Sequence, residues 1–170
     1  MNGPVKFTLA ALVAGAIFVA VDQAKAQQPV VQGGVVGTWT LVSETAHKGG
    51  KSTEPLGPNP VGSIMFDRGG RFMFLVARPD LPKFAANKRD AGTAEENKTV
   101  LEGLVAFIGT YSVSEADQSL TLHIEASTFP NFNGTDQKRY FTIAGDELKY
   151  TNRTPVIGAE VTELVWRRAP

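Results

Sequence analysis

His123 and Glu125 are the residues of this chain whose types and spacing could support acid–base chemistry. They stand two apart on a predicted strand over residues 120–126, so their side chains share one face. A histidine beside a carboxylate can act as a general base near neutral pH, and Arg139 could join the pair from the next strand. The other face of this strand is apolar and is expected to be the interior: Leu120, Leu122, Ile124 and Ala126. We therefore expect a solvated outer pair, and an active site only if the polar face turns inward.

Arg78 is a second polar candidate, at the end of a predicted strand over residues 71–78. It shares a face with Phe72, Phe74 and Val76, which would place a guanidinium at the rim of an apolar cavity. There it could bind a ligand carboxylate or phosphate through two parallel hydrogen bonds. The alternative, which we favour, is an ion pair with Asp80 or a cap on backbone carbonyls, because arginine is seldom buried without a protein partner.

Aromatic residues at alternating positions are the candidates for lining a cavity. Phe107 and Tyr111 share one face of a predicted strand over residues 104–113, and the Tyr111 phenol could orient a polar ligand atom. Ordinary core packing explains the same pattern, and we favour it slightly over a role in lining the cavity. Together with Phe72, Phe74 and Arg78, these residues form the predicted ligand-binding set.

The composition excludes several classes of function. The chain has no cysteine, which rules out thiol catalysis and thiolate metal sites, and its two histidines, His47 and His123, lack carboxylates at metal-ligand spacing. The 17 basic and 17 acidic residues leave no charge excess for nucleic acid or a polybasic membrane surface. Nucleophile-elbow, phosphate-loop and dinucleotide motifs are also lacking, so we expect no metal and no cofactor.

Residues 1–26 are expected to be a cleavable signal peptide. Lys6 provides a positive start, residues 7–21 are apolar, and Ala24-Lys25-Ala26 is a small-x-small cleavage site. The apolar run is shorter than the roughly 20 residues that span a bilayer. The sequence therefore predicts a bacterial periplasmic or secreted protein without a stable membrane anchor.

The rest of the chain predicts a flexible leader over residues 27–35 and an all-β domain over residues 36–170. Alternating patterns and turn signals delimit eight strands: 36–46, 61–66, 71–78, 104–113, 120–126, 138–144, 148–152 and 161–167. Residues 47–60 are expected to be a loop. Eight antiparallel strands can close into a barrel that holds one small ligand.

An insertion over residues 79–103 interrupts the strand pattern. Thr93 and Glu96 have the spacing of a capping box, which predicts a helix of about ten residues ending near Gly103. Asp80 could cap a short turn over residues 81–86. We expect the insertion to lie across one open end of the barrel as a lid or plug.

Several segments, in order over almost all of residues 36–170, resemble the bacterial lipocalin-like domain family: GTWTLVS, GPNPVGSIMFDRGGRFMFLVARPDLPKFA, FIGTYSV, LHIEASTFPNFNGTDQKRYF, GDEL and LVWRRA. The run TFPN followed by GTDQKR is the least common of these. The resemblance implies a lipocalin-type β-barrel but no particular reaction or substrate. The Thr-Asp-Tyr signature of true lipocalins is missing, so their ligand preferences carry over only loosely.

The resemblance also implies how one barrel end is closed. Lipocalin-type barrels carry Gly-x-Trp on the first strand, here Gly37 and Trp39, and a basic residue after the last. Arg168 shares a face with Trp166 and is the better candidate, ahead of Arg167, to stack on the Trp39 indole. Trp39 as a platform for a ligand is the weaker alternative.

Three functional hypotheses remain open. The first is an exported barrel that binds a small, largely hydrophobic molecule, with the insertion gating access. The second is an isomerase- or cyclase-type enzyme on the same scaffold, using His123, Glu125, Arg139 or Tyr111; this is the less favoured. The third is an envelope protein whose barrel is filled and whose partner is another protein. The sequence does not indicate an oligomeric state.

Overall fold

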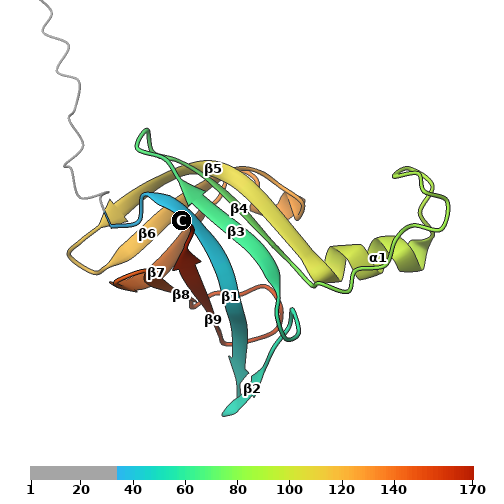
Figure 1. Ribbon diagram of the computed structural model, residues 1–170, viewed down its shortest axis with the longest axis horizontal. Helices are drawn as coiled ribbons and strands as arrows, with labels where there is room; N and C mark the ends of the chain where they lie inside the picture. The colour runs from blue at the N-terminus through green and yellow to red at the C-terminus, as the bar shows by residue number, and fades with distance from the viewer. Residues whose placement is uncertain (1–33) are drawn as a thin grey trace, which may run out of the picture.

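The computed structural model describes residues 34–170 and shows a single closed antiparallel barrel (Figure 1). The expected signal peptide, and all of the expected leader except Gly34 and Val35, lie outside the described residues. Val35 is buried in the core, so the packing of the barrel extends at least one residue before the expected domain start at Val36.

Nine strands follow one another in a meander, and each pairs with its sequence neighbours except around β2. Their bounds are β1 (Gly37–Lys48), β2 (Lys51–Thr53), β3 (Val61–Phe66), β4 (Arg71–Ala77), β5 (Leu104–Ser114), β6 (Ser119–Ser127), β7 (Asp136–Ala144), β8 (Glu147–Asn152) and β9 (Val161–Arg168). β1 also pairs with β9, which closes the ring. β2 pairs only with the far end of β1, so eight strands form the barrel and the prediction of an eight-stranded antiparallel barrel is confirmed.

The segment expected to be a loop over residues 47–60 is partly ordered as a strand. β1 runs on to Lys48, and the chain turns back through Gly49 and Gly50, both with positive φ, into β2. These adjacent glycines supply the turn conformation that side-chain-bearing residues rarely adopt.

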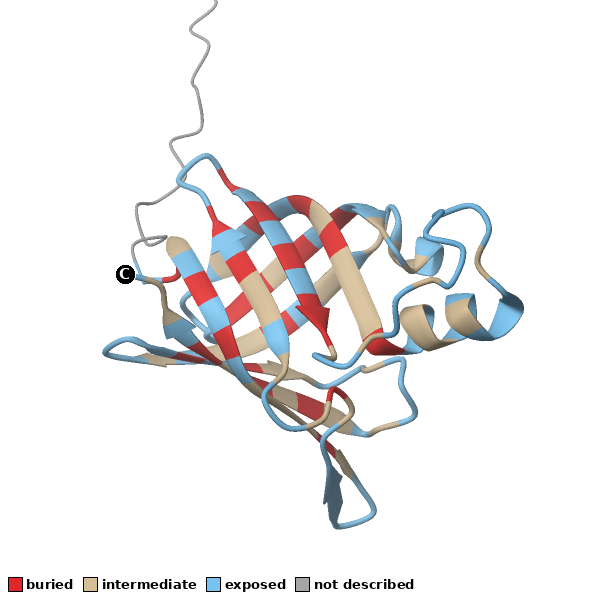
Figure 2. Ribbon diagram, turned by 45° about the vertical axis from the view of Figure 1, so that its right-hand side comes forward, coloured by how far each residue is buried: buried red, intermediate tan, exposed pale blue. Residues whose placement is uncertain are grey.

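Buried and exposed residues alternate along the strands, as Figure 2 shows. The inward positions carry apolar side chains that pack into one core, among them Trp39, Ile64, Leu122, Leu148 and Trp166, all with no exposed surface. This period of two is what a barrel with one solvated face requires.

A β-bulge in β1 changes which residues face the cavity. Leu41 pairs with Trp166 of β9 and Ser43 pairs with Val165, so Val42 is an extra residue without an opposite partner. The extra residue shifts the alternation by one. Strict alternation places Glu44 on the outer face with Thr38 and Thr40; this is wrong, because beyond the bulge Glu44 lies opposite the inward Leu164.

The insertion contains the expected helix but does not form the expected lid. Helix α1 (Ala94–Gly103) begins with the capping box, in which the Thr93 hydroxyl and the Glu96 carboxylate bond each other's backbone N–H groups. Within residues 81–86 the expected short turn is limited to Ala85 and Ala86, where the Asn87 N–H donates to the Phe84 carbonyl over 3.0 Å. α1 passes directly into β5 at Leu104, so the direction of β5 carries it away from the barrel instead of across its end (Figure 1).

No helix within residues 34–170 has the length and hydrophobicity of a membrane span.

Candidate ligand-binding cavity

A cavity of about 300 Å³ lies inside the barrel at the end where β4 finishes and β5 begins. Its mouth is surrounded by apolar side chains from two connections and from the last turn of α1: Leu56, Leu101, Val156 and Ile157. The volume is at the lower end of the range for small-molecule sites. This end of the barrel interior is therefore open space, whereas the third hypothesis requires an interior filled by side chains.

Aromatic rings form one wall of this cavity. The Phe74 and Phe107 rings are stacked, with centroids 4.3 Å apart and planes 12° apart. Phe132, from the connection between β6 and β7, meets Phe107 edge to face with centroids 6.1 Å apart. Flat apolar faces of this kind suit an aromatic or alicyclic ligand.

Polar side chains reach the same cavity from β1, β7 and β8. Arg139 is 3% exposed, and its guanidinium donates to the Lys138 carbonyl over 2.8 Å and to the Gln137 side-chain oxygen over 3.3 Å. Tyr150 is 2% exposed, and its hydroxyl has no hydrogen-bond partner among the described residues. The Arg139 guanidinium lies 5.9 Å from the centroid of the Tyr150 ring, so the two groups are neighbours.

The carboxyl group of Glu44 is the third polar group of the cavity. Burial raises its pKa from 4.5 to about 7, because water stabilises the charged form poorly there. Burial also raises the pKa of the Tyr150 phenol, and the positive charge of Arg139 partly offsets that effect. At mildly acidic pH the cavity thus contains a neutral carboxyl, a neutral phenol and a cationic guanidinium.

The structure places two of the five predicted ligand-binding residues, Phe74 and Phe107, on the cavity wall. Phe72 lies deeper in the core, edge to face with Phe107 at 5.8 Å between centroids. Tyr111 is also buried away from the cavity, and its hydroxyl donates to the Asp67 carbonyl over 2.7 Å. Burial raises the pKa of this phenol to about 12. Tyr111 therefore serves packing, the alternative that its pattern left open.

Arg78 does not line the cavity. Its guanidinium donates to both carboxylate oxygens of Asp80, over 3.0 and 2.9 Å, and lowers the pKa of that carboxyl. This is the ion pair named above as the alternative to ligand binding.

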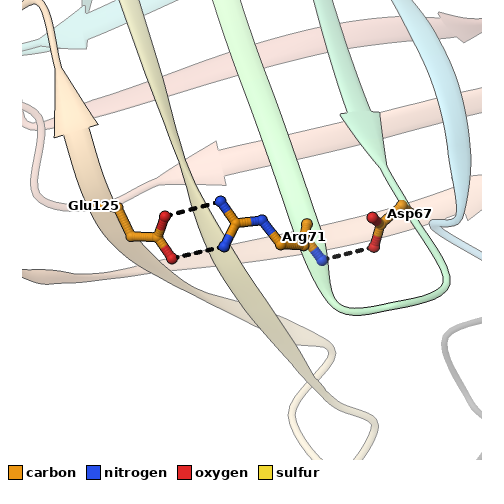
Figure 3. A network of polar contacts seen from close by, with 3 residues as sticks. All are labelled: Asp67, Arg71 and Glu125. Atoms are coloured by element: carbon orange, nitrogen blue, oxygen red, sulfur yellow. Dashed lines mark hydrogen bonds and ion pairs between the residues drawn. The ribbon is translucent and has the colours of Figure 1, made fainter.

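The four residues of the enzymatic hypothesis are not brought together. His123 and Glu125 are exposed on the outer face of β6, where His123 contacts Asp136 at 2.8 Å. Glu125 accepts two hydrogen bonds from Arg71 across β5, over 2.9 and 2.8 Å, while the Arg71 backbone N–H donates to Asp67 (Figure 3). The expectation that Arg139 could lie beside His123 is wrong: Arg139 points into the barrel from β7, opposite Leu120.

Sequence reasoning missed Glu44 and Tyr150 as cavity residues. Tyr150 follows Leu148 by two positions on a short strand, so alternation could have assigned it to the interior. The same signal was available for Arg139, which stands two residues before Phe141 and four before Ile143. Glu44 offered no such signal because of the bulge.

The opposite end of the barrel is closed by Trp39 and Arg168. The guanidinium of Arg168 lies 4.0 Å from the centroid of the Trp39 ring and donates to the carbonyls of Val36 and Gly34 over 3.0 and 2.9 Å. A side chain at Gly37 would be strained, because φ is 129° there and a Cβ would lie 3.0 Å from an Arg168 nitrogen that would have to shift. Trp166 precedes Arg168 by two residues on β9, is fully buried and lies edge to face with Phe74.

Within residues 34–170, no group of three or more histidine, aspartate or glutamate side chains is arranged to hold a metal ion.

Comparison with known proteins adds a relative and a family. The chain is 29% identical over 104 residues to a 4'-hydroxy-3'-methoxypropiophenone carrier protein of Aspergillus oryzae, a match that covers 56% of this chain and 94% of the relative. The model of the lipocalin-like domain family matches residues 36–169, almost the whole barrel. The closed eight-stranded meander and this match together show that the chain belongs to the lipocalin-like domain family.

Proposed function

We propose that this protein binds and carries a small, largely hydrophobic molecule inside its barrel. The observation that carries the proposal is the cavity of about 300 Å³ with its aromatic wall and apolar mouth. The relative's name, which describes a carrier of a small aromatic ketone, supports the same class of function.

The test uses N-phenyl-1-naphthylamine, an uncharged probe whose fluorescence rises in apolar sites. We expect saturable binding that is abolished in Val76→Trp, because the new indole would occupy the cavity. Leu75→Trp is the matched control, since Leu75 directly precedes Val76 in β4 and points outward. Val76→Phe provides a milder block if the larger ring unfolds the barrel. Absence of saturable binding to the wild-type protein, or equal binding to all three variants, would contradict the proposal.

We also propose that the protein acts outside the cytoplasm. The support is the signal-peptide pattern of residues 1–26. Intact-mass measurement of protein from the host should find a chain beginning at Gln27 in the extracytoplasmic fraction; a chain that retains residues 1–26 in the cytoplasm would contradict this.

A further inference from the structure

We propose that the carried molecule is a monoanionic carboxylic acid, whose carboxylate is bound inside the cavity by Arg139 and Tyr150. This inference rests on the proposed function and adds the chemical class of the ligand.

The first observation is that Arg139 is a buried cation without an anionic partner. It is 3% exposed and lines the cavity, yet among the described residues it forms no ion pair with a carboxylate. A guanidinium has five N–H donors, and the bonds to the Lys138 carbonyl and Gln137 leave several of them free. Because burial of an unpaired charge is costly, an anion from outside the chain would be bound strongly at this point.

The second observation is the unused hydroxyl of Tyr150. It is fully buried in the cavity wall beside the Arg139 guanidinium, which can only donate, so no group within residues 34–170 accepts the phenol proton, although buried hydroxyls are normally bonded. Because burial keeps the phenol protonated, it is a hydrogen-bond donor beside the guanidinium. The cavity thus presents two kinds of donor side by side to an accepting oxygen pair, which a carboxylate provides.

The third observation concerns the other charged groups that face this point. Glu44 from β1 is the acidic group inside the cavity, and its carboxyl is neutral below a pH of about 7. Glu102 of α1 stands at the mouth and lies 3.9 Å from the Lys98 ammonium. A single guanidinium without a counter-ion in an apolar cavity favours a ligand with one negative charge. The stacked Phe74 and Phe107 rings favour a ligand whose remaining part is flat and apolar.

The experiment compares 2-naphthoate with 2-naphthylmethanol as competitors of N-phenyl-1-naphthylamine at pH 6. The two competitors share the ring system and differ in the anionic group. For the wild-type protein we expect naphthoate to displace the probe at a concentration at least about tenfold lower than the alcohol does.

In Arg139→Met the ratio of the two displacing concentrations should fall to less than about threefold. Tyr150→Phe should lower this ratio by an intermediate factor. Arg153→Met is the matched control, because Arg153 lies 3.9 Å over the Tyr140 ring but is exposed outside the cavity. It should leave the preference unchanged.

The outcomes separate the two proposals. If the uncharged probe does not bind at all, the proposed function fails and this inference fails with it. If the probe binds but naphthoate has no advantage over the alcohol, or keeps its advantage in Arg139→Met, only the carboxylate inference is overturned. Arg139→Lys, which retains the charge, should keep part of the preference and shows whether loss in the methionine variant reflects charge.

Discussion

The Arg168 guanidinium lies 4.0 Å above the Trp39 ring and, in the same position, donates hydrogen bonds to two backbone carbonyls of the segment that enters β1. The side chain of Arg168 in β9 therefore contacts both the Trp39 indole and the backbone that leads into β1. The contact joins the two ends of the sheet at the end of the barrel away from the cavity.

Removal of this contact should weaken the whole barrel. We expect Arg168→Met to lower the free energy of unfolding by about 2–3 kcal/mol, from the lost cation–π contact and the charged hydrogen bonds. Chemical denaturation measures this directly. Arg167→Met is the control, because Arg167 is exposed on the opposite face of β9. Similar losses in the two variants would show that the stacked arrangement contributes nothing specific.

Gly109 should tolerate no side chain. Ile108 pairs with Ala126 and Gly109 pairs with Ile124, so β6 has a β-bulge at Glu125 beside this glycine. A Cβ at Gly109 would stand 1.8 Å from the backbone oxygen of His123. Because backbone must move to relieve this overlap, Gly109→Ala should cost about 3 kcal/mol or more. Gly69→Ala is a matched control, since its Cβ would meet only the movable Asp67 side chain at 3.3 Å. A thermal melt of Gly109→Ala close to that of the wild type would contradict the close approach of β5 and β6.

Glu44 should make the stability of the barrel depend on pH. Its pKa is 4.5 in the unfolded reference and about 7 in the folded protein. Between these values the unfolded chain loses the proton while the folded protein retains it, so the free energy of unfolding falls as pH rises from about 4.5 to 7 and is level above that. The loss should not exceed about 3 kcal/mol.

Glu44→Gln should remove this decline and be more stable than the wild type at pH 8. Urea titrations at pH 4.5, 6 and 8 provide the measurement. Glu147→Gln, at an exposed glutamate of β8, controls for a general change of charge. A Glu44→Gln profile parallel to the wild type would refute the assigned burial.

The outer pair on β6 should be irrelevant to binding. We expect His123→Ala and Glu125→Gln to leave the affinity for N-phenyl-1-naphthylamine within about twofold, because both side chains are exposed outside the barrel. Fluorescence titration of each variant beside the wild type measures this. A tenfold loss in either variant, with the fold retained by circular dichroism, would restore a role for this pair.

Local sequence patterns were sufficient to predict the eight strands and the capping box, through alternation with period two and a hydroxyl three residues before a glutamate. Trp39 with Arg168 as the closure pair came instead from the resemblance to the lipocalin-like family, because no local rule joins residues so far apart in the chain. The aromatic wall of Phe74 and Phe107 follows from the same alternation.

The polar part of the cavity and the direction of α1 were decided only by the tertiary structure. Glu44 faces inward because pairing with β9 leaves Val42 without a partner, and no local pattern marks that extra residue. Alternation could have placed Arg139 and Tyr150 inside the barrel one at a time, but that they are neighbours follows only from the pairing of β7 with β8. α1 leads away from the barrel because it continues into β5 without a loop, and a helix signal carries no information about that direction.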